Sequence, residues 1–239
     1  MNKPKIICHI MSSVDGRLIP SRWTPPFDGT PAGELFAEYA RLSRELNTDA
    51  WMFGLGTAQE GPLPERFIAK THEHELPREP FVAARPNDGR RMFIVSDPEG
   101  QIFYNTQTVR GDRIITIIGK GVSDEYLSHL QDRGISYVFG GETGYDLTVA
   151  MAEIADNFGV RSISLQGGGI IDGQMLADGL LDELSLVIYP GIDGLHGSPS
   201  IFEYIGGKTD RPAAGQSLEL ISATQCAHGV MHLRYKFHR

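Results

Sequence analysis

The chain has 239 residues, of which 41% are hydrophobic and 22% are charged, so we expect a soluble globular protein with a sizeable core. Its formal net charge of −8 gives the whole molecule no electrostatic attraction to nucleic acid or to anionic lipid. We find no apolar run of about 18 residues that would span a membrane and no signal peptide, so we expect a cytoplasmic protein.

Two cysteines, Cys8 and Cys226, lie too far apart in the sequence for a CxxC motif, and we expect both as free thiols. The stretch HEHE at residues 72–75 contains an H-x-E pattern, but the P-C-x-x-C motif that completes a zinc deaminase site is missing. We therefore expect no metal site, and we interpret this stretch, with His72 and His74, as a solvated loop.

The predicted elements begin with KIICHIM at residues 5–11, an apolar, β-branched run that is typical of a buried strand. We expect its His9 to be a core histidine with satisfied hydrogen bonds rather than a base. A long loop rich in Gly, Pro and Asp follows at residues 12–33, and its Trp23 either closes over a ligand or anchors the loop by packing. Apolar residues near helical spacing then predict an amphipathic helix over residues 33–46.

The rest of the chain alternates short apolar runs with helical segments. The apolar runs predict strands at residues 49–54, 91–97, 113–121, 135–141, 160–166 and 182–190. Helices are predicted at residues 123–134, 146–159 and 171–181. Ser123 and Asp146 are suited to cap the first two of these helices. Residues 217–239 alternate around a turn at His228–Gly229 and predict a terminal hairpin.

This order predicts an α/β fold with a mostly parallel central sheet, flanked by helices, and an antiparallel C-terminal hairpin. Strand–helix–strand repeats dominate residues 90–190, and the strands are almost continuously apolar, as a sheet covered on both faces requires. No repeat or linker is evident, so we predict a single domain over residues 1–239. The hairpin carries more apolar residues than an edge strand exposes comfortably, and we expect something to cover it, such as a second subunit.

Three consecutive glycines, Gly167 to Gly169, lie between a predicted strand and a predicted helix. At such a turn the free N–H groups of the first helical residues form an anion site, and glycines let a diphosphate approach the backbone. The alternative is a tight turn with close helix–sheet packing. The GxGxxG fingerprint of dinucleotide-binding proteins is not matched, because Asp172 stands three positions after Gly169.

A second glycine turn follows the strand predicted at residues 49–54 and offers Gly54, Gly56 and the hydroxyl of Thr57. Ligands of α/β sheets bind beyond the carboxyl ends of the strands, so this turn is also placed for a ligand. It fails the GxGxxG test too, since Gln59 stands at the third glycine position. Two glycine turns directly after strands favour one extended ligand with several phosphates.

Four stretches of the chain, in this order, resemble the riboflavin-biosynthesis reductases: IMSSVDGRL, DAWMFGLGT, RMFIVSDPEGQI and SISLQGGGIIDGQMLADGLLDELSLVIYPGIDG. That family comprises the C-terminal domain of the bifunctional deaminase–reductase and free-standing proteins, and it is related in fold to dihydrofolate reductase. The likeness spans nearly the whole chain, and the last stretch is its most specific part. It implies a free-standing, homodimeric reductase that uses NADPH to convert the ribosyl group of a pyrimidine ribosylamine phosphate to a ribityl chain.

The resemblance also implies roles for individual residues. The residues implied to bind the cofactor are Gly54, Gly56, Thr57, Ser96, Gly167, Gly168, Gly169 and Ile170. The residues implied to contact the substrate are Ser13, Asp15, Pro62, Leu63 and Gln166. Asp15, in the S-x-D-G turn, is the implied catalytic residue, and we expect it to orient the substrate rather than to transfer a proton. A plain Asx turn before Gly16 is the alternative interpretation of Asp15.

The chain departs from the family pattern at three places, and the resemblance implies that each of them faces the substrate rather than the cofactor. Gln166 stands where the family has glutamate, the segment after Thr57 is shorter, and the end of the first helix differs. They leave open an NADPH-dependent reductase of another small substrate, such as a pterin or an imine, and a non-catalytic nucleotide-binding protein. The basic partner of a cofactor 2′-phosphate is open between Arg90, Arg91 and Lys120.

Overall fold

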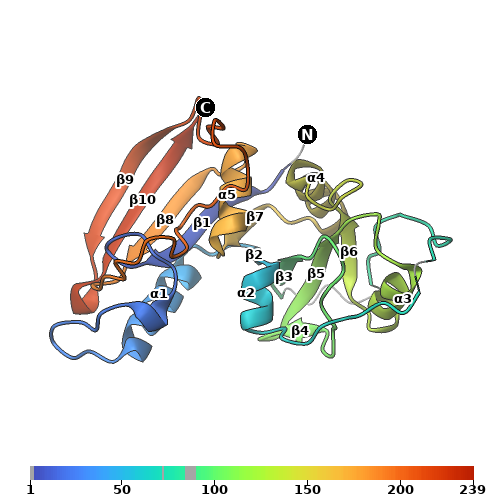
Figure 1. Ribbon diagram of the computed structural model, residues 1–239, viewed down its shortest axis with the longest axis horizontal. Coiled ribbons are helices and arrows are strands. Elements are labelled where there is room, and N and C mark those ends of the chain that lie inside the picture. Colours follow the sequence, from blue (N-terminus) through green and yellow to red (C-terminus); the bar gives the residue numbers. More distant parts are fainter. Residues whose placement is uncertain (1–2, 72, 84–89) are drawn as a thin grey trace. The chain divides into compact units, whose positions relative to one another are not determined.

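The computed structural model describes residues 3–71, 73–83 and 90–239, and its chain divides into two compact units (Figure 1). One comprises Met1–Pro4 and Asp49–Ile163 and is called the middle unit here. The other comprises Lys5–Thr48 and Ser164–Arg239 and is called the terminal unit. The prediction of a single reductase domain over residues 1–239 is not tested by this division and stays a prediction.

The middle unit is built on short parallel strands. Its described strands are β2 (Ala50–Gly54), β3 (Met92–Ser96), β4 (Thr108–Val109), β5 (Asp112–Ile118) and β6 (Ser136–Phe139). β2 pairs with β3, β3 with β5, and β5 with β6, all in parallel, whereas the two-residue β4 pairs antiparallel with β5. The sequence predicts all of these strands except β4, which is too short to show a pattern.

The helices of the middle unit are α2 (Leu55–Glu60), α3 (Asp124–Asp132) and α4 (Leu147–Phe158). The predicted caps are confirmed, because Ser123 accepts a hydrogen bond from the amide of Tyr126 and Asp146 accepts one from the amide of Val149. Helix α2 forms where the sequence predicts a glycine turn, and it buries Ala58 against the core.

An aromatic core holds the middle unit together. Trp51 from β2 packs on Phe93 from β3 with ring centroids 4.4 Å apart. The loop after β3 closes around Asp97, which is fully buried and accepts hydrogen bonds from the amides of Gln101 and Ile102. The hydroxyl of Tyr126 donates a third hydrogen bond to the same carboxylate at 2.6 Å. This network fixes the backbone directly after the carboxyl end of β3.

The terminal unit combines a parallel pair of strands with the antiparallel hairpin. Its strands are β1 (Lys5–Ser12), β8 (Glu183–Ile188), β9 (Ser217–Gln225) and β10 (Met231–His238), and β7 (Ser162–Leu165) enters it at residue 164. β1 pairs with β8 in parallel, while β10 pairs antiparallel with both β8 and β9. The hairpin turns at the 3-10 segment η2 (Ala227–Gly229), where the backbone of His228 is left-handed, so the predicted turn is confirmed.

Helix α1 (Ala32–Glu45) and helix α5 (Gly169–Ala177) belong to the terminal unit, together with the 3-10 turn η1 (Pro20–Arg22). α5 begins two residues before the predicted helix and ends four residues earlier, so Gly169 lies inside it. Trp23 is 9% exposed and packs on Tyr189 with ring centroids 4.8 Å apart, which supports the packing interpretation of Trp23.

His9 is a core histidine, as predicted. Its ring nitrogens lie 2.9 Å from the hydroxyl of Ser185 and 3.2 Å from the carbonyl oxygen of Tyr39, and its ring stacks on that of Tyr39. Cys8 and Cys226 are free thiols, also as predicted. The predicted fold class, α/β with mostly parallel strands, flanking helices and an antiparallel terminal hairpin, is confirmed.

Candidate functional site

The glycine turn between β7 and α5 is the most constrained part of the candidate site. Gly167 has a φ of +86°, and a Cβ atom there would lie 2.9 Å from the Cδ1 atom of Ile10. A Cβ atom on Gly169 would lie 2.3 Å from the carbonyl oxygen of Ser200. The left-handed backbone therefore already requires Gly167, and close packing against backbone requires Gly169, so the tight-turn and packing alternative left open by the sequence accounts for these two glycines.

A loop of the terminal unit packs directly against the start of α5. The amide of Glu203 donates to the carbonyl of Gly169 at 2.8 Å, and the carboxylate of Glu203 accepts from the amide of Ser200 at 3.0 Å. One turn further, a Cβ atom on Gly173 would lie 2.4 Å from the backbone of Glu203. The loop thus holds helix α5 through its backbone.

The same helix start has backbone amides that no side chain caps. α5 has nine residues, and its N-cap residue, Gly168, supplies no side-chain cap. The amides of residues 169–171 have no acceptor within the helix, because they belong to its first turn. Ile170 is 57% exposed, so the first turn of the helix is open to solvent. Free amides at the positive end of a helix dipole are the arrangement that a diphosphate group fits.

The S-x-D-G turn holds Asp15 in a fixed position. The hydroxyl of Ser13 donates to the Asp15 carboxylate at 2.6 Å, and the amides of Gly194 and Asp193 donate at 2.8 and 3.1 Å. These three donors, with Ser13 the strongest, lower the pKa of Asp15 to about 2. An exposed carboxylate that stays ionised at neutral pH can orient or stabilise a cation or a hydroxyl group, but it has no proton to donate.

Gln166 is tied to helix α1. Its side-chain nitrogen donates to the hydroxyl of Ser43 at 2.8 Å and to that of Ser164 at 3.1 Å. Both bonds require the N–H donors of an amide, and a glutamate at this position would have to accept from the hydroxyls instead. The neutral side chain is thus matched to its two serine partners.

In the middle unit, the structure brings together two of the residues implied to bind the cofactor. Gly54 ends β2 and Ser96 ends β3, and they are register partners in the parallel pair. Ser96 is buried, with 8% exposed. Gly54 then caps α2, which has only six residues, and Gly56 and Thr57 lie inside this helix. A Cβ atom on Gly56 would meet nothing within 4 Å.

The two implied substrate residues in the segment after α2, Pro62 and Leu63, differ in their exposure to solvent. Pro62 is exposed, whereas Leu63 is only 2% exposed and belongs to the core of the middle unit. The amide of Leu63 donates to the carbonyl of Ala58 at 2.8 Å and closes the end of the helix. Packing therefore accounts for Leu63, and its substrate role stays a prediction.

Sequence reasoning missed a cluster of glycines at the carboxyl ends of β5 and β6. A Cβ atom on Gly119 would lie 2.7 Å from the backbone of Thr143, and one on Gly140 would lie 2.6 Å from the carbonyl oxygen of Gly144. Gly144 has a φ of +84°. The stretches GKG and GGETG, each directly after a strand, carry this signal in the sequence. The cluster lets the loops after these strands approach closely.

The candidate partners of a cofactor 2′-phosphate have interactions of their own. Lys120 forms an ion pair with Glu142, with the charged atoms 2.7 Å apart. The guanidinium of Arg90 donates to the carbonyl of Gly111, and Arg91 is also engaged. The identity of the basic partner stays a prediction.

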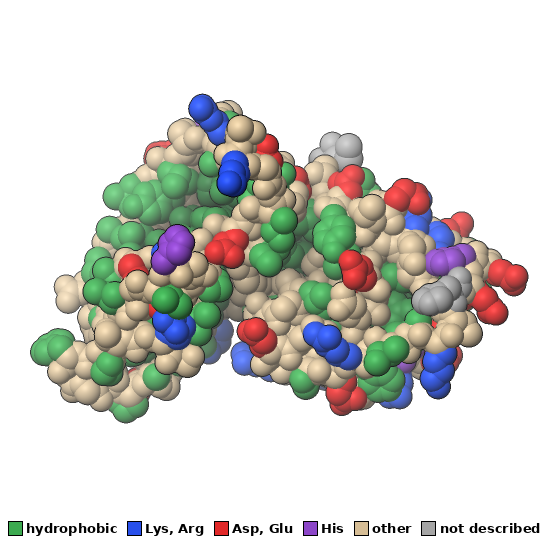
Figure 2. Space-filling model, viewed as in Figure 1, with side chains coloured by type: hydrophobic (Ala, Val, Ile, Leu, Met, Phe, Trp, Pro, Cys, Tyr) green, Lys and Arg blue, Asp and Glu red, His purple; other side chains and the backbone are tan. Residues whose placement is uncertain are grey.

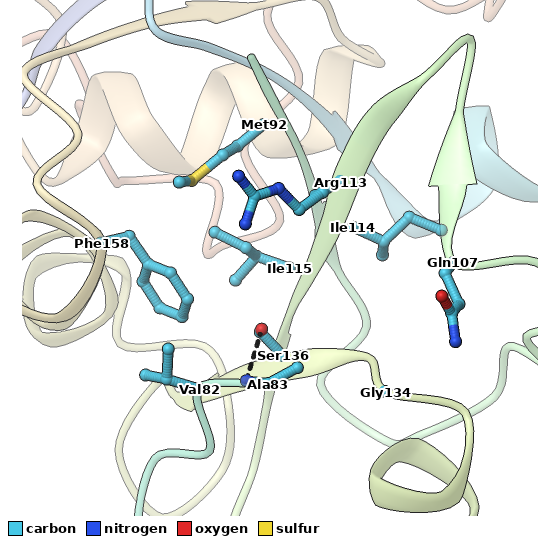
Figure 3. A pocket seen from close by; sticks show the side chains of 10 residues that line it. All are labelled: Val82, Ala83, Met92, Gln107, Arg113, Ile114, Ile115, Gly134, Ser136 and Phe158. Atoms are coloured by element: carbon cyan, nitrogen blue, oxygen red, sulfur yellow. Dashed lines mark hydrogen bonds between the residues drawn. The ribbon is translucent and has the colours of Figure 1, made fainter. Parts of the chain in front are cut away.

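A small cavity of the middle unit is lined in part by residues at the amino-terminal ends of its strands, whereas Gly54 and Ser96 lie at the carboxyl ends of β2 and β3 (Figure 3). Met92, Arg113 and Ser136, at or near the amino-terminal ends of β3, β5 and β6, contribute to its lining. Its volume is about 40 Å³, against the several hundred Å³ of a typical ligand pocket. We therefore do not place the candidate site there.

Across residues 3–71, 73–83 and 90–239, no three His, Cys, Asp or Glu side chains are grouped so as to hold a metal ion. His72, which belongs to the H-x-E pattern, lies outside the described residues. Within the same described part of the chain, no helix combines the length and apolar character needed to cross a membrane.

The chain belongs to the RibD C-terminal domain family, whose model matches residues 4–232. This membership supports an oxidoreductase of the riboflavin pathway and confirms the family resemblance of the four sequence stretches.

Solved structures share the fold at low identity. A pyrimidine reductase-like protein from Corynebacterium diphtheriae is 18% identical, with a TM-score of 0.67, over 100% of this chain and 93% of that one. RibD from Acinetobacter baumannii is 15% identical, with a TM-score of 0.62, over 100% of this chain and 59% of that one. The riboflavin biosynthesis reductase of Saccharomyces cerevisiae is 13% identical, with a TM-score of 0.54, over 100% and 91%.

Proposed function

We propose that this chain is an NADPH-dependent reductase that acts on a pyrimidine ribosylamine phosphate of the 5-amino-6-(5-phosphoribosylamino)uracil type. Membership in the RibD C-terminal domain family over residues 4–232 is the observation that carries the proposal. The reductases named among the similar structures support the same class of reaction.

The start of α5 would hold the diphosphate of the cofactor. The free amides of residues 169–171 and the exposed position of Ile170 support this assignment. Gly54 and Ser96 of the middle unit, paired at the carboxyl ends of β2 and β3, are themselves placed where ligands of α/β sheets bind. A bound reduced nicotinamide supplies the hydride, and the protein supplies alignment and electrostatics.

Asp15 would act on the substrate by charge and position. The three donors that hold its carboxylate leave it ionised, so it stabilises a positively charged imine or fixes sugar hydroxyl groups. A group with a pKa of about 2 is not poised to donate a proton at neutral pH. The structure therefore supports an orienting role over general acid catalysis.

The test is turnover of the ribosylaminopyrimidine phosphate with NADPH, followed by the loss of NADPH absorbance and by identification of the ribityl product. We expect turnover with this substrate and loss of most of it in the Asp15→Asn variant. Tight NADPH binding without turnover of this substrate would overturn the substrate assignment.

Gln166 favours a second candidate, an NADPH-dependent reductase of another small substrate such as a pterin or an imine. Its amide is matched to Ser43 and Ser164, so the position carries no negative charge. Turnover of a pterin or imine panel, with no turnover of the ribosylaminopyrimidine phosphate, would establish this second candidate. NADPH binding without hydride loss to any tested substrate would indicate a non-catalytic nucleotide-binding protein.

We also propose that the protein is a homodimer. Three apolar side chains of β9, Leu218, Leu220 and Ile221, are 50%, 54% and 47% exposed, and apolar side chains gather over the hairpin in Figure 2. An edge strand with this much exposed apolar surface is a candidate for pairing with a second copy. Light scattering should give twice the chain mass, and a monomeric mass would contradict the proposal.

A further inference from the structure

Asp172 is a buried acid directly behind the glycine turn. It is the fourth residue of helix α5 and is 0% exposed. Apart from the weak thiol donor of Cys8, neither of its carboxyl oxygens has a hydrogen-bond partner among the described residues. A buried carboxylate without donors is strongly disfavoured, so such a side chain calls for an explanation.

The groups that face Asp172 do not offer a positive charge. The Cys8 thiol on β1 and the Tyr39 hydroxyl on α1 are the titratable groups that act on it from neighbouring elements, and the acidic Glu203 lies on the loop packed over α5. Burial raises the pKa of Asp172 well above its usual value, and the weak thiol donor of Cys8 offsets only part of this. The pKa values of Cys8 and Tyr39 are raised by burial as well. The environment thus favours the neutral acid.

The carboxyl group also lies close to the glycine turn that leads into this helix start. A Cβ atom on Gly167 would lie 3.8 Å from the Oδ2 atom of Asp172. The amide of Asp172 donates to the carbonyl of Gly168 at 3.2 Å, so the residue is fixed to the turn through its backbone. A negative charge here would act through a poorly screened, buried medium on any anion bound at the first turn of α5.

We propose that the charge on Asp172 sets how tightly the Gly167–Gly169 turn binds an anionic diphosphate: the neutral acid permits binding and the carboxylate opposes it. The inference rests on the proposed function, because it takes the start of α5 as the diphosphate site. It makes Asp172 a positioning residue that acts on the ligand through its charge and without contact. Binding of the anion and protonation of Asp172 are then reciprocally linked.

The first test is NADPH affinity from about pH 6 to about pH 9, the range in which fully buried carboxyl groups titrate in other proteins. It compares the wild type, Asp172→Asn and a matched control, Asp178→Asn, which removes an exposed acid at the other end of the same helix. We expect the wild type and Asp178→Asn to lose on the order of tenfold in affinity as the pH rises, and Asp172→Asn to lose much less. Parallel curves for all three proteins would overturn the inference.

A second measurement uses the wild type alone and therefore does not depend on whether a variant folds. Infrared difference spectroscopy of the wild type should show the carbonyl band of a protonated, buried carboxyl group, and NADPH should raise the pH at which this band disappears. A band that ignores NADPH would overturn the inference even if NADPH binds. If NADPH does not bind at any pH, the proposed function fails. Inorganic pyrophosphate titrated into the same three proteins then tests the role of Asp172 by itself. Absence of pyrophosphate binding, or the same pH dependence of pyrophosphate affinity in all three proteins, would overturn the inference.

Discussion

The two glycine turns look alike in sequence but differ in what their glycines do. At the turn of the terminal unit, Gly167 is left-handed and Gly169 has no space for a Cβ atom. At the turn of the middle unit, Gly54 has an extended backbone, with a φ of −75°, and Gly56 faces open space within helix α2. The first turn is constrained by its backbone conformation and its packing, whereas Gly56 of the second turn could be replaced by a larger residue without a clash.

The difference shows that a count of glycines does not separate packing from binding. Two glycines of the triple run are explained without a ligand, Gly167 by its left-handed backbone and Gly169 by the backbone of Ser200. What points to a ligand there is the uncapped, exposed first turn of a nine-residue helix. The middle-unit turn has the glycines without a comparable helix, since α2 has six residues.

Alanine substitutions in the two turns are expected to differ most in their effect on the stability of the protein. We expect Gly169→Ala to destabilise the protein by about 3 kcal/mol or more, because the new methyl group would collide with backbone rather than with a movable side chain. Gly56→Ala should be neutral or stabilising by up to about 1 kcal/mol, since alanine favours a helix interior over glycine. Urea unfolding measures both, and equal losses in the two variants would break the comparison.

The second prediction concerns His9, a titratable group buried in the terminal unit. Burial lowers its pKa from 6.5 to about 4, so in this window the folded state binds fewer protons than the unfolded state. Stability should therefore be intact above pH 6.5 and fall by about 3 kcal/mol as the pH drops to about 4.

Urea unfolding of the wild type and of His9→Gln at a series of pH values measures this loss. The glutamine variant should lose less stability across the window, because it has no imidazole to protonate. An equal loss in both proteins would show that other groups cause the acid sensitivity.

A smaller effect is expected for Asp15→Asn. The amide keeps the size of the side chain but loses its charge, and its NH2 group becomes a donor that faces either the amide of Gly194 or the amide of Asp193. If catalysis needs the oriented charge, kcat/KM should fall by roughly tenfold or more while NADPH affinity stays within about twofold. Unchanged kinetics would support the plain Asx turn.

The smallest effect is expected for Gln166→Ala, which removes the hydrogen bonds to Ser43 and Ser164. Two neutral hydrogen bonds on a half-buried side chain predict a loss of about 1 kcal/mol in unfolding free energy. A Ser43→Ala variant should reproduce part of this loss, and a loss of several kcal/mol would indicate a larger structural role.

Local patterns predicted most of the fold because each element has a clear local cause. Ser123 and Asp146 cap their helices, and the apolar runs form the parallel strands. Strand β4 was missed because two residues show no periodicity, and helix α2 because its glycines suggest a turn.

The site was harder to predict because its contacts are distant in sequence. The loop that packs Glu203 against Gly169 lies within residues 193–203, as do the two amides that hold Asp15 in addition to the nearby Ser13 hydroxyl. No pattern in that segment of the sequence indicates these contacts. The burial of Asp172 is likewise a tertiary property. In the sequence, Asp172 only breaks a GxGxxG match.

The most direct test of the account is a crystal structure of the protein soaked with NADPH. The account predicts electron density for the diphosphate against the amides at the start of α5, residues 169–171, with Ile170 beside it. Density for the diphosphate at another part of the molecule, with these amides in contact only with solvent, would contradict it.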